Sequence, residues 1–278
     1  MRIKFLILFA TISVLGSIAA VLFFSSRNPQ VIAVQNYVAQ ESQTLSESKP
    51  TANATAEQKI SSFSLPVMMY HFIRSYNNPA DPIGTNLSVA PDTLSKQLQW
   101  LQDNNYATVG LDYFSNPVAM DKKPVVLTFD DGYQDAYDEA FPLLKQHGFI
   151  GVFYIIINNV NKPSYLSWDE IREMQAAGMI FGSHTMNHVE LQNLSPARLK
   201  DEVFTSKNIL EKELGRPVND FCYPGGKYDK LTLEAVKRAG YITATTTHSG
   251  IDDEKSPSLE LTRLRITNDT SFAKILAP

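Results

Sequence analysis

The sequence predicts an α/β fold built on a parallel sheet, and three observations support this prediction. From Leu65 onward, short apolar runs alternate with amphipathic segments of helical spacing. Such alternation is typical of a parallel sheet with helices packed outside it. Polar residues directly follow several of the apolar runs, as ligand-binding residues do at the carboxyl ends of parallel strands. The 278 residues suffice for one full-sized domain with extensions.

The first half of the folded part contains three expected strands and two expected helices. Leu94, Leu98 and Leu101 recur at helical spacing, and Gly148 stands where a glycine commonly ends a helix. The apolar runs between these segments are short enough for buried strands. The strands are expected at 66–70, 124–129 and 150–157, and the helices at 92–104 and 135–146.

The second half continues the same alternation. Ser167 and Glu170 form a capping-box pattern, which predicts that a helix begins at this point. Ser195 begins a long helix that reaches about residue 214, and Gly240 ends another helix that begins at Asp229. Strands are expected at 179–182, 221–223, 241–245 and 261–266.

The N-terminal end predicts export. The uncharged run from Phe5 to Phe24 would, as a helix, span about 30 Å, the thickness of the hydrocarbon core. Arg2 and Lys4 precede it, so the positive-inside rule leaves the short N-terminus in the cytoplasm and places the remainder outside. A signal peptide cleaved after the small residues at 17–19 is the alternative, but the apolar run continues beyond them. We therefore expect an uncleaved transmembrane signal-anchor in 1–24 that tethers the domain to the cell membrane.

Residues 25–62 predict a disordered linker, because Gln, Ser, Thr, Asn and Ala dominate there without any period. The folded domain is then expected at 63–278.

The net charge of −4 and the lack of a long basic run argue against nucleic acid as a partner. The single cysteine, Cys222, excludes an internal disulfide, so the domain must depend on its core for stability.

Paired carboxylates and paired imidazoles carry the candidate chemistry. Asp130 and Asp131 follow a fully apolar strand. His184 and His188 follow another strand at a spacing of four residues, which would put both rings on one face of a helical turn. Such a histidine pair alone is common among surface residues. Together with one carboxylate, it forms a metal ligand set that leaves coordination positions open for water and substrate, as in catalytic metal sites. The other carboxylate would stay ionised as a general base. His71 directly follows the first strand, so it would share the same rim.

These residues resemble the motifs of the polysaccharide deacetylases, the carbohydrate esterase family 4 that shares the NodB homology domain. The first motif reads Thr128-Phe129-Asp130-Asp131-Gly132, and the second reads His184-Thr185-Met186-Asn187-His188. The resemblance covers the chain from about residue 65 to the C-terminus. It implies a distorted (β/α)7 barrel in which Asp130 is the base and Asp131, His184 and His188 hold a metal. That metal is usually zinc in the family, and the ligand set also admits cobalt or nickel.

Two departures from the family pattern point to a subgroup. Cys222 stands where the third motif carries an arginine that tethers the base, and the C-terminal strand lacks the histidine that acts as the general acid. Met69-Tyr70-His71 on the first strand is similar to the subgroup that de-N-acetylates poly-β-1,6-N-acetylglucosamine in biofilms, where the acid comes from the N-terminal end. The resemblance therefore makes His71 the acid, with Arg263 or Arg265 as the replacement tether.

The expected function is the metal-dependent hydrolytic removal of N-acetyl groups from extracellular or cell-wall polysaccharide that contains N-acetylglucosamine. A backbone N–H in Tyr223, Pro224 or Gly225 would hold the oxyanion of the reaction. The same site would also suit an O-acetyl polysaccharide esterase, and a third alternative is a non-catalytic glycan-binding surface protein. The expected partners are the acetylated polysaccharide as substrate and the membrane, reached through the N-terminal helix.

Overall fold

The computed structural model describes residues 62–276. These residues confirm the predicted α/β class, because strands and helices alternate along them. The signal-anchor expected at 1–24 and all but the last residue of the linker expected at 25–62 lie outside the described residues. Within 62–276, no helix has both the length and the apolar character that crossing a bilayer requires.

The main sheet is parallel and curled. Its strands are β2 (Val67–Tyr70), β5 (Tyr106–Thr108), β6 (Lys123–Phe129), β7 (Val152–Ile155), β8 (Ile180–Ser183), β9 (Asp220–Cys222), β10 (Thr243–Thr245) and β12 (Leu264–Arg265). They lie in the order β10-β9-β8-β7-β6-β2-β12, with β5 also beside β6, and every pair is parallel. A bridge between Thr245 and Leu261 joins β10 to the segment just before β12, which draws the ends of the sheet together. This curled sheet fits a distorted barrel.

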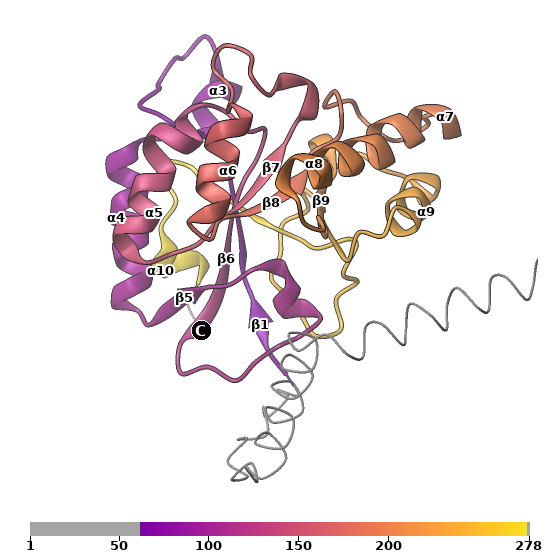
Figure 1. Ribbon diagram of the computed structural model, residues 1–278. Helices are drawn as coiled ribbons and strands as arrows, with labels where there is room; N and C mark the ends of the chain where they lie inside the picture. The colour runs from indigo at the N-terminus through magenta and orange to yellow at the C-terminus, as the bar shows by residue number, and fades with distance from the viewer. Residues whose placement is uncertain (1–61, 277–278) are drawn as a thin grey trace, which may run out of the picture. The chain divides into compact units, whose positions relative to one another are not determined.

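Helices flank the sheet on two sides, as Figure 1 shows. One flank holds α4 (Pro91–Asp103), α5 (Phe141–His147) and α6 (Trp168–Ala176), and the other holds α7 (Pro196–Leu199), α8 (Ser206–Leu214) and α9 (Lys230–Arg238). Two π-helical segments, η2 (Ala136–Ala140) and η4 (Lys200–Thr205), directly precede α5 and α8. The capping box of Ser167 and Glu170 is present, and Gly148 ends α5 with a φ of 66°. Local capping chemistry therefore sets several helix ends.

Several short elements were not expected from the sequence, because strands of two residues carry no readable period. The strand expected at 261–266 is also shorter in the structure, where β12 pairs with β2 and Leu261 forms only an isolated bridge. The additional elements are β1 (Ser64–Leu65), which pairs antiparallel with β11 (Asp252–Asp253), β3 (Phe72–Ile73), which pairs with β4 (Ser88–Val89), the three-residue strand β5, α3 (Pro82–Asn86), η1 (Leu111–Phe114), η3 (Ile157–Asn159), η5 (Pro224–Gly226) and α10 (Phe272–Ile275).

Strand β6 lies between two hydrophobic clusters and is apolar on both faces. Val125 and Leu127 pack into the larger cluster and Val126 into the smaller one, and all three side chains are fully buried. Phe129, the last residue of β6, is in register with Tyr70, the last residue of β2, and their stacked ring centroids are 5.1 Å apart. Because the two strands are parallel, the residues that follow them leave the sheet side by side.

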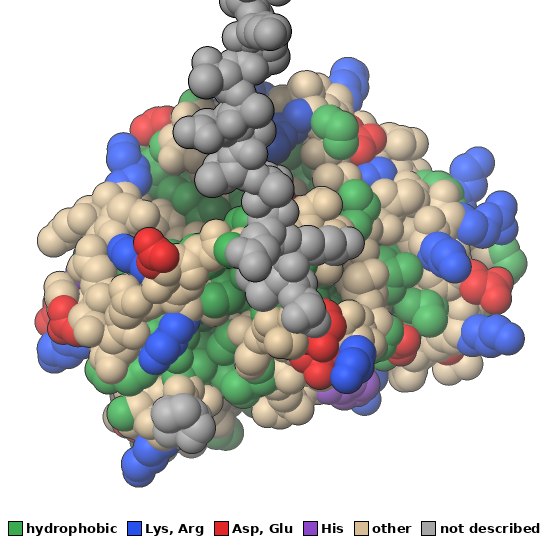
Figure 2. Space-filling view, turned by 90° about the horizontal axis from the view of Figure 1, so that it is seen from below, with side chains coloured by type: hydrophobic (Ala, Val, Ile, Leu, Met, Phe, Trp, Pro, Cys, Tyr) green, Lys and Arg blue, Asp and Glu red, His purple; other side chains and the backbone are tan. Residues whose placement is uncertain are grey.

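The surface carries charges of both signs. On the face shown in Figure 2, lysine and arginine side chains stand around the edge with acidic side chains between them. This interspersed pattern agrees with the small net charge of −4. It differs from the single-sign basic stripe that nucleic-acid-binding surfaces present.

Candidate active site

His71 and Asp130 meet at the carboxyl edge of the sheet, immediately after β2 and β6. The Nε2 atom of His71 lies 3.6 Å from Oδ2 of the buried Asp130. The next two residues, Asp131 and Gly132, have φ values of 77° and 72°. Two consecutive residues in the left-handed region turn the chain sharply, so the neighbouring carboxylates face different surroundings. A side chain at Gly132 would also approach Ile155, because its Cβ would lie 3.1 Å from Cδ1.

Arg263 holds Asp130 by a two-point contact. Its Nη1 donates to Oδ1 of Asp130 at 2.7 Å and its Nη2 donates to Oδ2 at 2.9 Å. Its Nε donates to the carbonyl oxygen of Thr246 at 2.8 Å, and the arginine is only 1% exposed. Bidentate pairing of this kind is the strongest contact an arginine makes with a carboxylate. Arg265, the other expected tether, is exposed and takes part in none of the ion pairs found in 62–276.

Burial and charge act in opposite directions on Asp130. Burial disfavours its carboxylate, but Arg263 and then His71 outweigh burial, so the pKa of Asp130 is lowered. The pKa of His71 is also lowered, chiefly by burial, although Asp130 and Asp131 oppose that shift. The pair therefore combines a firmly ionised carboxylate with an imidazole that gives up a proton readily.

Asp131, His184 and His188 form a second cluster beside this pair. Oδ1 of Asp131 lies 3.5 Å from Nε2 of His184 and 3.3 Å from Nε2 of His188. This oxygen is buried and has no hydrogen-bond partner among the described residues. Burial lowers the pKa of His188, with a further contribution from His184, and so favours the neutral imidazole that can bind a metal. A buried carboxylate oxygen that faces two imidazole nitrogens therefore fits a metal ligand set.

The expectation that the two histidines share a helical turn is wrong. Thr185 has a φ of 70° and His188 a φ of 56°, so the chain enters the left-handed region twice and forms a compact non-helical turn. Oγ1 of Thr185 accepts a hydrogen bond from the His188 N–H at 2.9 Å. The centroids of the His184 and His188 rings are 4.7 Å apart. A spacing of four residues brings side chains together in such a turn as well as in a helix.

Cys222 ends β9 and contacts both clusters. Its carbonyl oxygen accepts from Nδ1 of His184 at 2.8 Å, which places the proton on Nδ1 and leaves Nε2 free to face Asp131. Its Sγ lies 3.2 Å from Nη2 of Arg263 and 3.8 Å from Oδ2 of Asp130. Burial raises the pKa of the thiol, so Cys222 stays neutral. The charge that the family's third-motif arginine would supply comes instead from Arg263.

The stretch expected to hold the oxyanion continues from β9 into η5. The N–H of the buried Tyr223 donates to the carbonyl oxygen of Thr245 at 3.1 Å. The Tyr223 hydroxyl donates to the carbonyl oxygen of Leu259 at 3.0 Å. Pro224 has no N–H to offer. Gly225 is exposed and has a φ of 59°, so its N–H remains as the candidate donor within this stretch.

Two groups near the site were not identified from the sequence, namely the carbonyl of Cys222 and the side chain of Glu202. Glu202 is fully buried and accepts hydrogen bonds from the backbone of the turn between the two histidines. The sequence did contain a signal for it, because Glu202 lies among Leu199, Val203 and Leu210 on the buried stripe of its helix. An acidic residue in that position needs buried partners.

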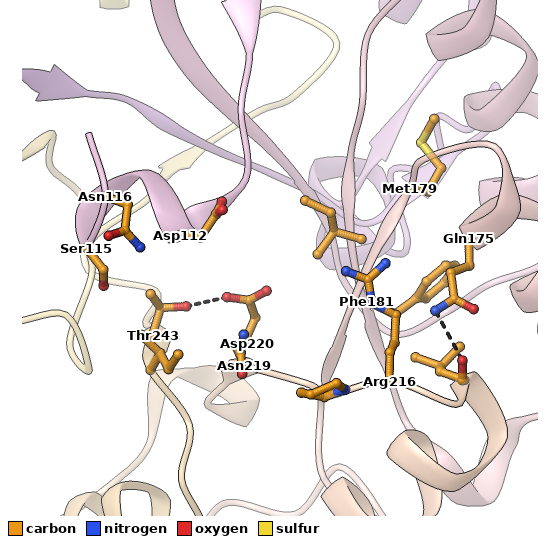
Figure 3. A pocket seen from close by; sticks show the side chains of 14 residues that line it. Asp112, Ser115, Asn116, Gln175, Met179, Phe181, Arg216, Asn219, Asp220 and Thr243 are labelled. Atoms are coloured by element: carbon orange, nitrogen blue, oxygen red, sulfur yellow. Dashed lines mark hydrogen bonds between the residues drawn. The ribbon is translucent and has the colours of Figure 1, made fainter. Parts of the chain in front are cut away.

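A cavity of about 280 Å³ lies at the opposite edge of the sheet (Figure 3). The first residues of three neighbouring strands, Ile180, Asp220 and Thr243, contribute to its lining. Asp220 accepts from Oγ1 of Thr243 at 2.5 Å, and burial raises the pKa of its carboxyl group to about 6. Because parallel strands present Asp130 and His184 at their other ends, this cavity is separate from the candidate active site.

Comparison with known proteins agrees with the motifs. Residues 118–244, which include both motifs, match the family described as polysaccharide deacetylase. YxkH of Bacillus subtilis, which is named as a polysaccharide deacetylase, is 32% identical over 207 residues, or 73% of this chain and 71% of YxkH. The poly-beta-1,6-N-acetyl-D-glucosamine N-deacetylase of Escherichia coli K12 is 24% identical over 233 residues, which cover 67% of this chain and 34% of that protein.

A solved structure gives the same result. The deacetylase PplD of Streptococcus pyogenes, in complex with acetate, is 32% identical, and its fold matches with a TM-score of 0.72. The match covers 77% of this chain and 96% of PplD. On the match with YxkH, which extends over most of both proteins, the chain belongs to the polysaccharide deacetylase family.

Proposed function

We propose that this protein is a metal-dependent hydrolase that removes N-acetyl groups from polysaccharide containing N-acetylglucosamine. The observation that carries the proposal is one rim with two adjoining parts, a proton-transfer pair and a metal ligand set. The pair is Asp130 with His71, and the ligand set is Asp131 with His184 and His188. The name of the Escherichia coli relative describes the same reaction on such a polymer, and PplD was solved with acetate, the acid that deacetylation releases.

Zinc is the proposed metal, with cobalt and nickel as alternatives. Two ligand atoms at about 2.05 Å from a tetrahedral zinc lie about 3.3 Å apart. The separations of Oδ1 of Asp131 from the Nε2 atoms of His184 and His188 are 3.5 and 3.3 Å, which fits this spacing. A divalent cation held by these three residues would polarise the acetamide carbonyl and acidify a water molecule. Asp130, His184 and Cys222 also lie within ligand reach of one another, but Arg263 binds both oxygens of Asp130 and burial keeps the Cys222 thiol neutral. We therefore assign the metal to Asp131, His184 and His188.

The proton transfers would be divided between two residues of the chain. Asp130, kept ionised by Arg263, would accept a proton from the attacking water. His71 would donate a proton to the leaving nitrogen, because an amine anion does not leave unaided. Burial lowers the pKa of His71, so the protonated ring would be the minor form at neutral pH but a stronger acid once it has taken up its proton. The N–H of Gly225 would donate to the oxyanion.

The organisation of the whole chain is part of this proposal. A signal-anchor at 1–24 and a linker at 25–62 would hold the domain at 63–278, a distorted (β/α)7 barrel, outside the cytoplasm. The uncharged run from Phe5 to Phe24 behind Arg2 and Lys4 supports this orientation. A protease added to intact cells should then degrade the domain while a cytoplasmic marker survives. Equal protection of the domain and the marker would contradict the orientation.

Acetate release tests the activity. The full-length protein is incubated with purified N-acetylglucosamine polymers and, separately, with O-acetylated polysaccharide, before and after chelation. We expect acetate from the N-acetyl polymers, its loss after chelation, and its return when zinc or cobalt is added back. Activity that survives complete metal removal contradicts the proposal. Release from O-acetyl substrates alone indicates an esterase, and tight polymer binding without release indicates a glycan-binding protein.

Two variants test the division of proton transfer. Asp130→Asn and His71→Ala should each lower kcat/KM by about 10²–10⁴-fold, the usual contribution of one acid or base. Both should bind metal about as tightly as the parent protein, because neither residue belongs to the proposed ligand set of Asp131, His184 and His188. Undiminished turnover in either variant would move that role to another residue.

A further inference from the structure

The turn that carries His188 is strained. Thr185 and His188 both have positive φ values, 70° and 56°, although neither is glycine. Residues held in sparsely populated backbone regions cost about 1–3 kcal/mol each and persist only where the surroundings over-determine them. His188 is also exposed, so packing around its own side chain does not fix the turn. Another part of the molecule must therefore hold this backbone.

The fully buried carboxylate of Glu202 contacts the backbone of this turn. Its Oε2 accepts hydrogen bonds from the N–H groups of Met186 and Asn187, at 3.1 and 3.0 Å. Its Oε1 accepts from Nδ2 of Asn187 at 2.8 Å and from Nη2 of Arg198 at 2.9 Å. Four donors therefore fill the acceptor capacity of this carboxylate. Three of them belong to the two residues at the centre of the turn.

A carboxylate is the group that this arrangement requires. An amide in its place would present an NH₂ group to at least one of the donors that now bind Glu202. Asn187 has no simple way to adapt by exchanging its amide oxygen and nitrogen, because its Oδ1 already accepts from Nδ2 of Asn158 at 2.7 Å. Arg198 supplies the balancing charge from an exposed position, with its side chain 51% exposed. The buried charge is thus compensated mainly by the turn itself.

The helix segment that carries Glu202 is fixed to the strand that precedes His184. Glu202 lies in the π-helical segment η4, and single π-helical turns within α-helices are rare and frequently occur at functional sites. The backbone carbonyl oxygen of Glu202 accepts a hydrogen bond from Oγ of Ser206 at 2.7 Å. Oγ of Ser206 also lies 2.8 Å from Oγ of Ser183, the last residue of β8. The same segment therefore holds the strand end and the turn that follows it.

We infer that Glu202 is a positioning residue that holds the turn at 185–188 in the conformation that aims His188 at Asp131 and His184. The inference rests on the proposed function, because it takes these three residues as the metal ligand set. Glu202 acts through the backbone of the turn and contacts none of the ligand atoms.

Metal binding by the full-length protein tests this inference, with zinc titration for affinity and the visible spectrum of bound cobalt for geometry. Glu202→Gln should weaken metal binding by about 10–100-fold, the usual effect of losing a residue that orients a ligand, and should change the cobalt spectrum. Arg198→Ala is the matched control, because it removes the ion-pair partner but keeps the carboxylate on the turn. The control should bind metal within about twofold of the parent, since three of the four donors to Glu202 come from the turn itself and remain in this variant.

The outcomes separate the inference from the proposed function. If the parent protein binds neither metal, the proposed function fails. If the parent binds metal and a folded Glu202→Gln variant binds it equally well with an unchanged spectrum, the positioning role is refuted. Should the variant not fold, amide hydrogen exchange of the metal-free parent decides. The Met186 and Asn187 amides should exchange about a hundredfold more slowly than in an unstructured peptide, and exchange at peptide rates would overturn the inference.

Discussion

Replacing Arg263 with methionine is the most direct test of how the candidate base is kept ionised. The guanidinium is 1% exposed and donates to both oxygens of Asp130. Methionine keeps much of the apolar volume but removes every donor. Of the site residues described above, His71 and Cys222 would still lie near Asp130. Oδ2 of Asp130 is 3.6 Å from Nε2 of His71 and 3.8 Å from Sγ of Cys222. The carboxylate would then be buried without a permanent cation beside it.

The expected loss of stability is large and depends on pH. Removing one partner of a buried ion pair costs about 3–5 kcal/mol at neutral pH, because the other charge remains uncompensated. In the parent, the lowered pKa of Asp130 gives stability that is present above the unfolded value of about 3.9 and is lost only as the pH falls through the still lower folded value. In the variant, burial without the arginine raises that pKa above 3.9. The variant should therefore recover part of its loss as the pH is lowered from 7 to 5.

Urea unfolding at pH 7 and pH 5, followed by circular dichroism, measures both effects. The matched control is Arg265→Met, because Arg265 is exposed and lies two residues away on the same segment. The control should change the free energy of unfolding by no more than about 0.5 kcal/mol. The reasoning is refuted if Arg263→Met is no less stable than the control at pH 7. It is also refuted if the deficit does not shrink at pH 5.

Three further predictions concern other parts of the molecule. The raised pKa of Asp220, about 6, means that its contribution to the free energy of unfolding should fall as the pH rises from about 4 to 6. Asp220→Asn should therefore make the fall measured by urea unfolding smaller, and Asp135, whose pKa is also raised to about 6, should account for part of what remains. The Cys222 thiol is fully buried and its pKa is raised, so it should react with a thiol reagent only after unfolding, and rapid labelling of the native protein would contradict its burial. Gly226→Ala should destabilise the protein more than Gly148→Ala, which should cost about 1 kcal/mol. Both glycines have a φ of 66°, but only a Cβ at Gly226 would collide with Thr247, so equal unfolding midpoints would refute the steric argument.

Much of the fold was readable from the sequence because the relevant signals are local. The capping box at Ser167, the C-terminal glycine at Gly148 and the apolar run of β6 each act within a few residues. The paired aspartates were recognisable for the same reason, since the two residues are adjacent and directly follow a strand. Two-residue strands such as β3 and β4 could not be predicted, because so short a segment carries no period.

The sequence by itself indicated the order of the longer strands and helices and the polar residues that follow β2, β6 and β8, and therefore the set of groups available for chemistry. Only the tertiary structure decided which of them meet. Arg263 and Arg265 are two residues apart and would share a face of an ideal strand, so local pattern could not choose between them. In the structure, β12 begins after Arg263, whose guanidinium reaches Asp130 inside the curled sheet. Partner choice of this kind depends on packing between segments more than a hundred residues apart, and no local period or motif encodes it.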